Sequence, residues 1–129
     1  AASRLLDGGR GAAEECLKLI DESDVDDLNK RDSLGMTALH YFSLSGSVEA
    51  ATALLGHVEF KEVNAVDLHR PNMKSQAYNR TALHIAALLG HVDIASAILG
   101  RADFTEVHAK DSDNFTALHL AVMKGHAMR

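Results

Sequence analysis

Thr-Ala-Leu-His occurs three times in the chain, at Thr37–His40, Thr81–His84 and Thr116–His119. The surroundings repeat as well, because eleven of 22 positions are identical when Gly46–Asp67 is laid on Gly90–Asp111. Self-similarity with a period of a few tens of residues is the signature of a repeat protein, in which each unit packs on its neighbours. The sequence therefore predicts a stack of similar units.

Each unit predicts two short helices joined by a glycine. Thr37 opens a helix that runs through about Ser45, and Gly46 ends it by relieving the steric penalty of a left-handed backbone. A second helix over about Val48–Leu55 is expected to be closed in the same way by Gly56. Helices of about eight residues are marginal alone in water, so we expect neighbouring repeats to stabilise them.

The rest of the chain follows the same plan. The second copy predicts helices over Thr81–Leu89 and Val92–Leu99, and the third begins at Thr116 and stops before its second helix can form. Upstream, Ala12–Asp21 has apolar residues at helical spacing and corresponds to a second helix. A short helix is expected within Ala1–Arg10. An acidic connection follows Asp21 and ends at Asp32.

The repeated unit, Asp-x-x-Gly-x-Thr-x-Leu-His-x-Ala followed by a Gly-ended helix and a Leu-Leu-bearing second helix, resembles the ankyrin repeat. The residues that carry the resemblance are Asp32, Gly35, Thr37–His40, Thr81–Ala86, Gly90, His91, Leu99, Gly100, Asp111, Thr116–Ala121, Gly125 and His126. The resemblance covers about Gly11 to Arg129. It implies an all-α solenoid of stacked helix-turn-helix units with hairpin-like loops, about three to four repeats in a single domain over 1–129. The expected repeats span 1–31 (degenerate), 32–66, 67–110 and 111–129 (truncated).

Three departures from the family pattern are informative. Alanine replaces the usual proline of the helix-opening tetrapeptide in every copy, which keeps a good helix former there. The turn glycine, Gly35, is replaced by Asn79 and Asn114, and asparagine tolerates the left-handed region. An insertion, Leu68–Tyr78, contains Pro71 and predicts an enlarged hairpin finger. The finger is either a functional element or a tolerated surface insertion.

The residue content argues against an enzyme or a metal protein. In ankyrin-like repeats the repeated Thr and His hydrogen-bond to each other and to nearby backbone, so the resemblance assigns Thr37, His40, Thr81, His84, Thr116 and His119 to structural roles between repeats. No His-x-x-x-His pair, phosphate loop or nucleophile elbow occurs, so we expect no cofactor, metal or catalytic site. Cys16 lies on an apolar helix face and is interpreted as a small buried hydrophobe.

Composition narrows the partner and the compartment. The formal charge of −5 lacks the positive field that attracts nucleic acid. A single cysteine allows no intrachain disulfide, which favours a reducing compartment. No apolar run approaches the roughly 20 residues of a membrane helix, so we expect no direct membrane insertion. We expect an intracellular, cytoplasmic protein, with an organelle-associated assembly as the alternative.

The resemblance also implies where a protein or peptide partner would bind. Ankyrin-like stacks bind partners through hairpin tips and the exposed face of their first helices. The predicted partner-binding residues are Leu34, Met36, Leu44, Tyr78, Arg80, Leu88, Leu89, Phe115, Met123 and Lys124, with Arg70 and Met73 of the finger. Most are apolar, which is typical of an interface. The alternative for Leu44, Leu88 and Leu89 is partial burial between repeats.

Three functions remain open at this point. The first is a non-catalytic adaptor or scaffold, the second a permanent subunit of a large assembly, and the third a regulatory domain of a larger enzyme or channel. Leu118, Leu120 and Ala121 lie on a first helix without a second helix, so either the chain continues or another chain covers this end. Asn64 resembles asparagines that are hydroxylated in ankyrin repeats, and its alternative is a loop residue that bonds its own backbone.

Overall fold

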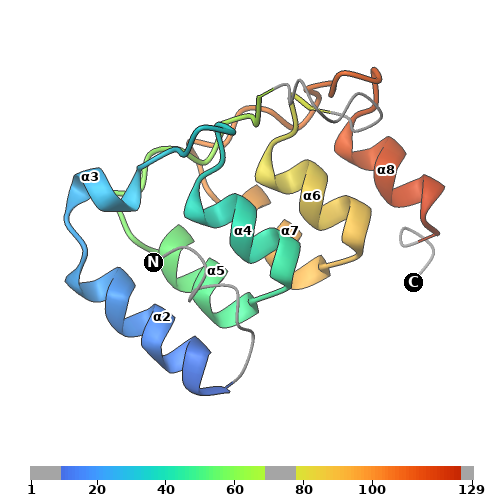
Figure 1. The fold of residues 1–129 in the computed structure, drawn as a ribbon. Helices are drawn as coiled ribbons and strands as arrows, with labels where there is room; N and C mark the ends of the chain where they lie inside the picture. Colours follow the sequence, from blue (N-terminus) through green and yellow to red (C-terminus); the bar gives the residue numbers. More distant parts are fainter. Residues whose placement is uncertain (1–9, 69–77, 126–129) are drawn as a thin grey trace.

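The structure, a computed structural model, describes residues 10–68 and 78–125 and contains, within them, seven helices and no strand. The helices are α2 (Arg10–Glu22), α3 (Val25–Leu28), α4 (Ala38–Ser45), α5 (Val48–Leu55), α6 (Ala82–Leu89), α7 (Val92–Leu99) and α8 (Ala117–Met123). Pairs of antiparallel helices stack side by side (Figure 1). The all-α prediction is confirmed, and α5 and α7 have the predicted bounds.

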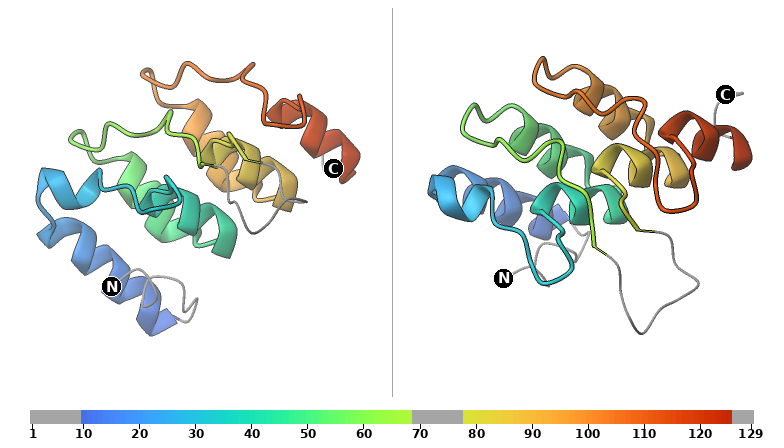
Figure 2. Two further views of the ribbon diagram at one scale, coloured as in Figure 1. Left: turned by 45° about the horizontal axis from the view of Figure 1, so that its top comes forward. Right: turned by 90° about the horizontal axis from the view of Figure 1, so that it is seen from above.

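The helices form two layers. α4, α6 and α8 pack side by side in one layer, and α2, α5 and α7 pack side by side in the other, while α4 packs on α5 and α6 on α7 (Figure 2). The loops that lead into α4, α6 and α8 lie along one side of the stack, at the N-terminal ends of these helices (Figure 1). We call α4, α6 and α8 the inner row and α2, α5 and α7 the outer row.

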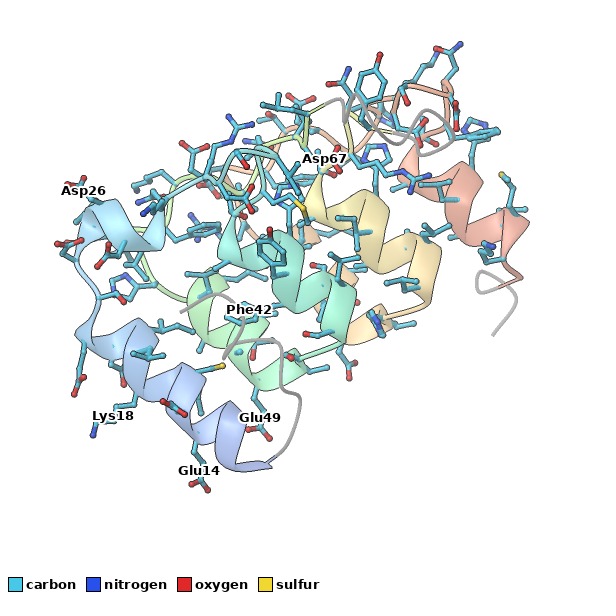
Figure 3. The ribbon with its side chains drawn as sticks, viewed as in Figure 1. Glu14, Lys18, Asp26, Phe42, Glu49 and Asp67 are labelled. Atoms are coloured by element: carbon cyan, nitrogen blue, oxygen red, sulfur yellow. The ribbon has the colours of Figure 1, made fainter. Side chains whose placement is uncertain are left out.

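Aliphatic side chains and alanines fill the space between the layers. Phe42 lies inside the stack (Figure 3) and is fully buried, as are Leu39, Leu54, Phe60, Ile94 and Ile98. Ala50, Ala51 and Ala86 are buried too, and their small side chains let adjacent helices approach closely. Glu14 and Lys18 of α2 point away from the stack (Figure 3). The low aromatic content is therefore compatible with a closed core.

The N-terminal part differs in detail from the expectation. α2 is the predicted helix over Ala12–Asp21 with one or two more residues at each end. The acidic connection contains a short helix, α3, that the sequence reading missed. Asp24 caps it by accepting a hydrogen bond from the Asp27 N–H at 2.9 Å. The predicted helix within Ala1–Arg10 and finger residues 69–77, with Arg70 and Met73, lie outside the described residues.

The helix-ending glycines fall into two classes. Gly46 and Gly90, after inner-row helices, are left-handed with φ of 72° and 78°, as predicted. Gly56 and Gly100, after outer-row helices, are right-handed with φ of −77° and −76°, so the prediction that Gly56 acts like Gly46 is wrong. The physical reason is that the Gly56 N–H still donates to the Thr52 carbonyl at 2.9 Å, which continues the helical turn. No left-handed residue is needed there.

Candidate partner-binding surface

Each inner-row helix begins with a reciprocal cap between threonine and histidine. The Thr81 hydroxyl accepts from the His84 N–H, and the Thr81 N–H donates to His84 Nδ1 at 3.1 Å. The same pair of bonds joins Thr37 to His40 and Thr116 to His119. This is a capping box with histidine in the place of the usual glutamate or glutamine, and it satisfies N–H groups that the helix leaves unpaired.

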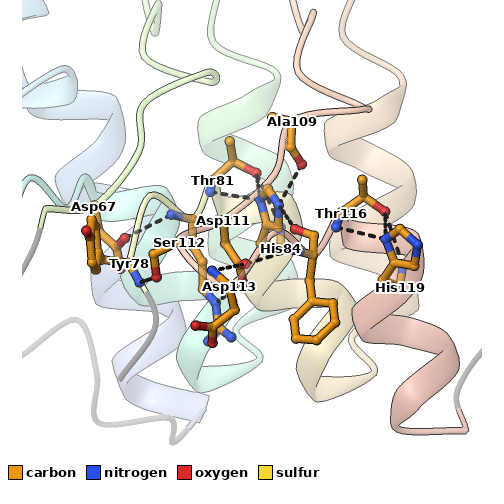
Figure 4. A network of polar contacts seen from close by, with 12 residues as sticks. Asp67, Tyr78, Thr81, His84, Ala109, Asp111, Ser112, Asp113, Thr116 and His119 are labelled. Carbon is orange, nitrogen blue, oxygen red and sulfur yellow. Dashed lines mark hydrogen bonds and ion pairs between the residues drawn. The ribbon is translucent and has the colours of Figure 1, made fainter. Parts of the chain in front are cut away.

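The second ring nitrogen of the buried histidines bonds to the next loop. His40 Nε2 lies 3.1 Å from the Arg80 carbonyl, and His84 Nε2 lies 3.0 Å from the Ala109 carbonyl (Figure 4). Because Nδ1 accepts a backbone N–H, Nε2 carries the proton and donates. Burial lowers the pKa of His40 and of His84 below the ordinary value. These neutral rings join consecutive units.

Aspartates organise the loop tips. The Asp111 carboxylate accepts from the N–H groups of Asp113 and Phe115 at 2.9 and 3.0 Å and from Arg80 Nε at 3.1 Å (Figure 4). Burial would raise the pKa of Asp111, but these donors hold it below its usual value. Asn114, in the same tip turn as Asp111, is left-handed with a φ of 67°. Asn79 at 60° and Gly35 at 74° are left-handed at the equivalent positions. The prediction of one shared left-handed turn is confirmed.

Two asparagines of the outer loops bond to the following unit. Asn64 Nδ2 donates to the Asp103 carbonyl, and its Oδ1 accepts from the Thr105 N–H, both at 2.9 Å. Asn29 makes the equivalent pair of bonds with the Glu59 carbonyl and the Lys61 N–H. The Asn64 amide therefore bonds backbone of the next unit rather than its own. The sequence analysis did not predict these contacts between an asparagine and the next loop, because a single sequence does not show which loop lies opposite each asparagine.

The caps and the bonds between units therefore recur from one unit to the next. A family model described as ankyrin repeats in three copies matches residues 9–105 and again 61–128. The chain belongs to the ankyrin-repeat family. A comparison with curated proteins finds no match. The inner row is thus the first helix of each ankyrin repeat, and the outer row is the second.

The three described inner-row helices each carry an exposed or half-buried apolar residue at the same position of the repeat. Leu44 is 46% exposed, Leu88 is half-buried and Met123 is 59% exposed. We call Leu44, Leu88 and Met123 the apolar ladder. The next position holds Ser45, Leu89 and Lys124, all exposed. The position is exposed in Leu44 and Met123 and half-buried in Leu88.

Among the other predicted partner-binding residues, four lie at the loop tips and one, Met36, does not. Leu34, Tyr78, Arg80 and Phe115 are half-buried at the loop tips, and Phe115 lies 6.2 Å from the His119 ring. Met36 is only 3% exposed, so its placement in the groove is wrong. It directly precedes the Thr37 cap, where an apolar side chain packs back onto the first helical turn. Its N–H and carbonyl are both bonded to Asp32, which holds it at the base of the tip.

The end of the stack at α8 is a second apolar surface of a different kind. Leu118 is 69% exposed, whereas its counterpart Leu83 is 4% exposed. Leu99, Val107 and Val122 are also exposed there. Leu120 was expected to be uncovered with Leu118, but it is buried because α8 packs on α6. Leu88, the ladder residue whose helix has described inner-row neighbours on both sides, is half-buried, whereas Leu44 and Met123 lie on the outermost described helices of the row and are exposed.

Other kinds of site find little support in the described parts of the chain. Within the described residues, 10–68 and 78–125, the His, Cys, Asp and Glu side chains form no group of three or more that could hold a metal ion. Cys16 is buried, as its helical position suggested. No helix in those same two segments has the length and apolar character needed to cross a membrane.

Proposed function

We propose that this chain is a non-catalytic adaptor or scaffold module whose protein partner binds across the inner row. Ankyrin repeats are in general protein-interaction modules. The observation that carries the proposal is the apolar ladder, which places apolar side chains at the same position of three successive repeats, exposed in Leu44 and Met123 and half-buried in Leu88. Aligned apolar side chains exposed at such a position are typical of a protein interface, and methionine adapts to its partner.

The loop tips extend the proposed site beyond the ladder. The inner row is flanked at its loop tips by Leu34, Tyr78, Arg80 and Phe115, and Lys124 lies at the other end of α8. The hydrogen bonds of Asp111 and Arg80 hold two of the tips in fixed positions (Figure 4). Rigid tips lower the ordering cost of binding. Arg70 and Met73 of the finger remain proposed partner contacts.

Site-specific photo-cross-linking tests the proposal. A photoreactive residue replaces Leu44 in one variant and Val58, an exposed residue of an outer loop, in a control variant. We expect a protein cross-link from position 44 and none from position 58. Cross-links that form only from position 58, or equally from both, would contradict the placement of the site.

A permanent subunit of a larger assembly is the second candidate function, and the exposed end face favours it. Leu99, Val107, Leu118 and Val122 together would need a covering surface in such an assembly. Size-exclusion chromatography separates the two functions. An adaptor elutes as a monomer at all concentrations, whereas a permanent subunit associates or aggregates without its neighbours.

The proposed setting is the cytoplasm. The sequence has a single cysteine, Cys16, and so allows no intrachain disulfide, which suits a reducing compartment. The formal charge of −5 supports a protein partner over nucleic acid. Fractionation of cells that express the tagged chain tests this setting.

A further inference from the structure

Three loop tips lead into the inner row. The first tip is residues 32–36, the third is residues 111–115, and the second is residues 67–80, of which 67, 68 and 78–80 are described. Each tip is closed at its base by the same backbone bond, from the N–H of its aspartate to the carbonyl of the residue before the capping threonine, at 2.9 to 3.1 Å. The insertion in the second tip therefore leaves the base of that tip intact.

The second tip is bonded to both of its neighbours. On one side, the Leu68 N–H donates to the Leu34 carbonyl of the first tip at 2.8 Å. On the other side, Tyr78 exchanges two bonds with Ser112 of the third tip: its N–H donates to Ser112 Oγ at 2.9 Å, and its carbonyl accepts from the Ser112 N–H at 2.8 Å (Figure 4). The two ends of the insertion are thus fastened to opposite neighbours.

Arg80, the last residue of the second tip, is bonded to the repeats of all three tips. Its carbonyl accepts from Nε2 of His40, at the start of the helix that follows the first tip, at 3.1 Å. Its N–H donates to Oδ1 of Asp67 within the second tip at 2.9 Å. Its Nε donates to Oδ2 of Asp111 in the third tip at 3.1 Å. One residue therefore joins three successive repeats.

The bond from Arg80 to the third tip is specific to this residue. Met36 and Phe115 stand at the same place in the first and third tips, and their side chains are apolar. The Asp111 side chain is fully buried and that of Arg80 is 19% exposed, so salt screens this ion pair less than a pair at the surface. A buried carboxylate that loses its cation keeps an uncompensated charge, so the third tip depends on the position of Arg80.

The main chain of Arg80 carries the same dependence to the first repeat. Its carbonyl is the acceptor for His40, and the His40 ring also caps α4 through the Thr37 N–H. A shift of Arg80 therefore weakens the start of α4 and the tip that precedes it. Chains of bonded groups of this kind can carry energetic coupling between distant sites.

We propose that Arg80 is a coupling residue that makes the three tips one conformational unit. A change imposed on the third tip at Asp111 displaces Arg80 and reaches the first tip through His40. The coupling belongs to the free chain and rests on the proposed function only for its use, because a partner that orders one tip would then order the other two at a lower entropic cost.

Amide hydrogen exchange of the full chain, followed by NMR, tests the coupling. The reporters are the N–H groups of Leu34 and Gly35 in the first tip, both of which donate to Asp32. Asp111→Asn keeps an acceptor for the N–H groups of the third tip but removes the charge that holds Arg80. Arg80→Met removes the guanidinium from the other side of the pair.

The matched control is Lys110→Met, which deletes an exposed cation beside the third tip. We expect Arg80→Met and Asp111→Asn each to speed exchange of the first-tip reporters roughly fivefold or more, and Lys110→Met to leave it unchanged. The double variant should exchange no faster than Arg80→Met, since both substitutions break the same link.

Two results overturn the coupling: exchange that changes only in the third tip of Arg80→Met, or effects of Arg80→Met and Asp111→Asn that add in the double variant. Circular dichroism checks that each variant is folded, and Arg80→Met is sufficient by itself if Asp111→Asn does not fold. Because exchange is measured without a partner, a negative result leaves the cross-linking test of the proposed function unaffected.

Discussion

The backbone N–H of Thr81 donates to Nδ1 of His84 at 3.1 Å, and this contact decides which nitrogen of the buried ring carries the proton. With Nδ1 occupied as an acceptor, Nε2 donates to carbonyls of the next repeat. A protonated ring would carry hydrogen on both nitrogens and lose the Thr81 bond. The Thr81 N–H bond of the cap therefore depends on a neutral histidine, whereas Nε2 can donate to the next repeat in either protonation state.

Acid should weaken the fold first through His40 and His84. Their folded pKa values lie below the ordinary 6.5, so at pH below 6.5 the unfolded chain binds more protons and stability falls. The contribution is complete above pH 6.5 and is lost as the pH drops toward the folded pKa values. Each histidine contributes a slope of at most about 1.4 kcal/mol per pH unit. Urea unfolding at pH 7.5, 6.5 and 5.5 measures it.

A histidine variant provides the control for the acid effect. His84→Asn lowers stability at pH 7.5 but flattens the loss between pH 7.5 and 5.5, because the titrating group is gone. A slope that His84→Asn leaves intact would assign the acid effect to other groups.

Gly46→Ala should destabilise the chain by about 1–2 kcal/mol or more. Gly46 has a φ of 72°, and an added Cβ would lie 2.8 Å from Cε1 of His91. Gly100→Ala is the matched control, because its backbone is right-handed and the nearest atom would be at 3.5 Å. That control should be neutral or stabilise by a few tenths of a kcal/mol. Thermal unfolding compares them, and equal losses would refute the two-class description of these glycines.

Ser43→Ala should stabilise the chain by about 1 kcal/mol. Ser43 is fully buried, and its hydroxyl has no hydrogen-bond partner among the described residues. An unsatisfied buried hydroxyl costs about 1–3 kcal/mol, and the equivalent residue of the next repeat is already Ala87. Ser96→Ala, at an exposed position of α7, should change little. A loss of stability in Ser43→Ala would show that the hydroxyl is bonded.

Asn64→Ala should cost about 1–3 kcal/mol. The substitution removes the donor to the Asp103 carbonyl and the acceptor for the Thr105 N–H. His108 occupies the equivalent position one repeat later and is exposed, so His108→Ala should be nearly neutral. Urea unfolding of both variants checks the contrast. Similar losses of stability in the two variants would contradict a specific role of the Asn64 side chain in joining the two repeats.

Local features of the fold could be predicted from the sequence because local chemistry decides them. Gly35, Asn79 and Asn114 share a turn that requires positive φ, and few other residues tolerate it. Thr37 and its equivalents cap helices with their own side chains. Helix ends and tip turns follow from such short-range preferences.

Burial and contacts between repeats could not be predicted, because they depend on which surface lies opposite. Met36 reads as an exposed tip residue, yet its place before the helix cap directs it inward. Leu118 and Leu120 look alike in the sequence, but only Leu120 faces α6. For the candidate site, Leu44 and Met123 were predicted as surface residues and are exposed. Their role in binding stays a prediction.

Arg101 gives the stack a property that no single repeat has. Its guanidinium donates to the carbonyls of Leu55 and Phe60 at 2.9 and 2.6 Å, while Asn64 reaches the opposite way to the loop that follows Arg101. The boundary between the two repeats is thus fastened from both sides. Neither outer loop can open without releasing bonds held by the other, so their amide hydrogens should exchange with deuterium in a single concerted event.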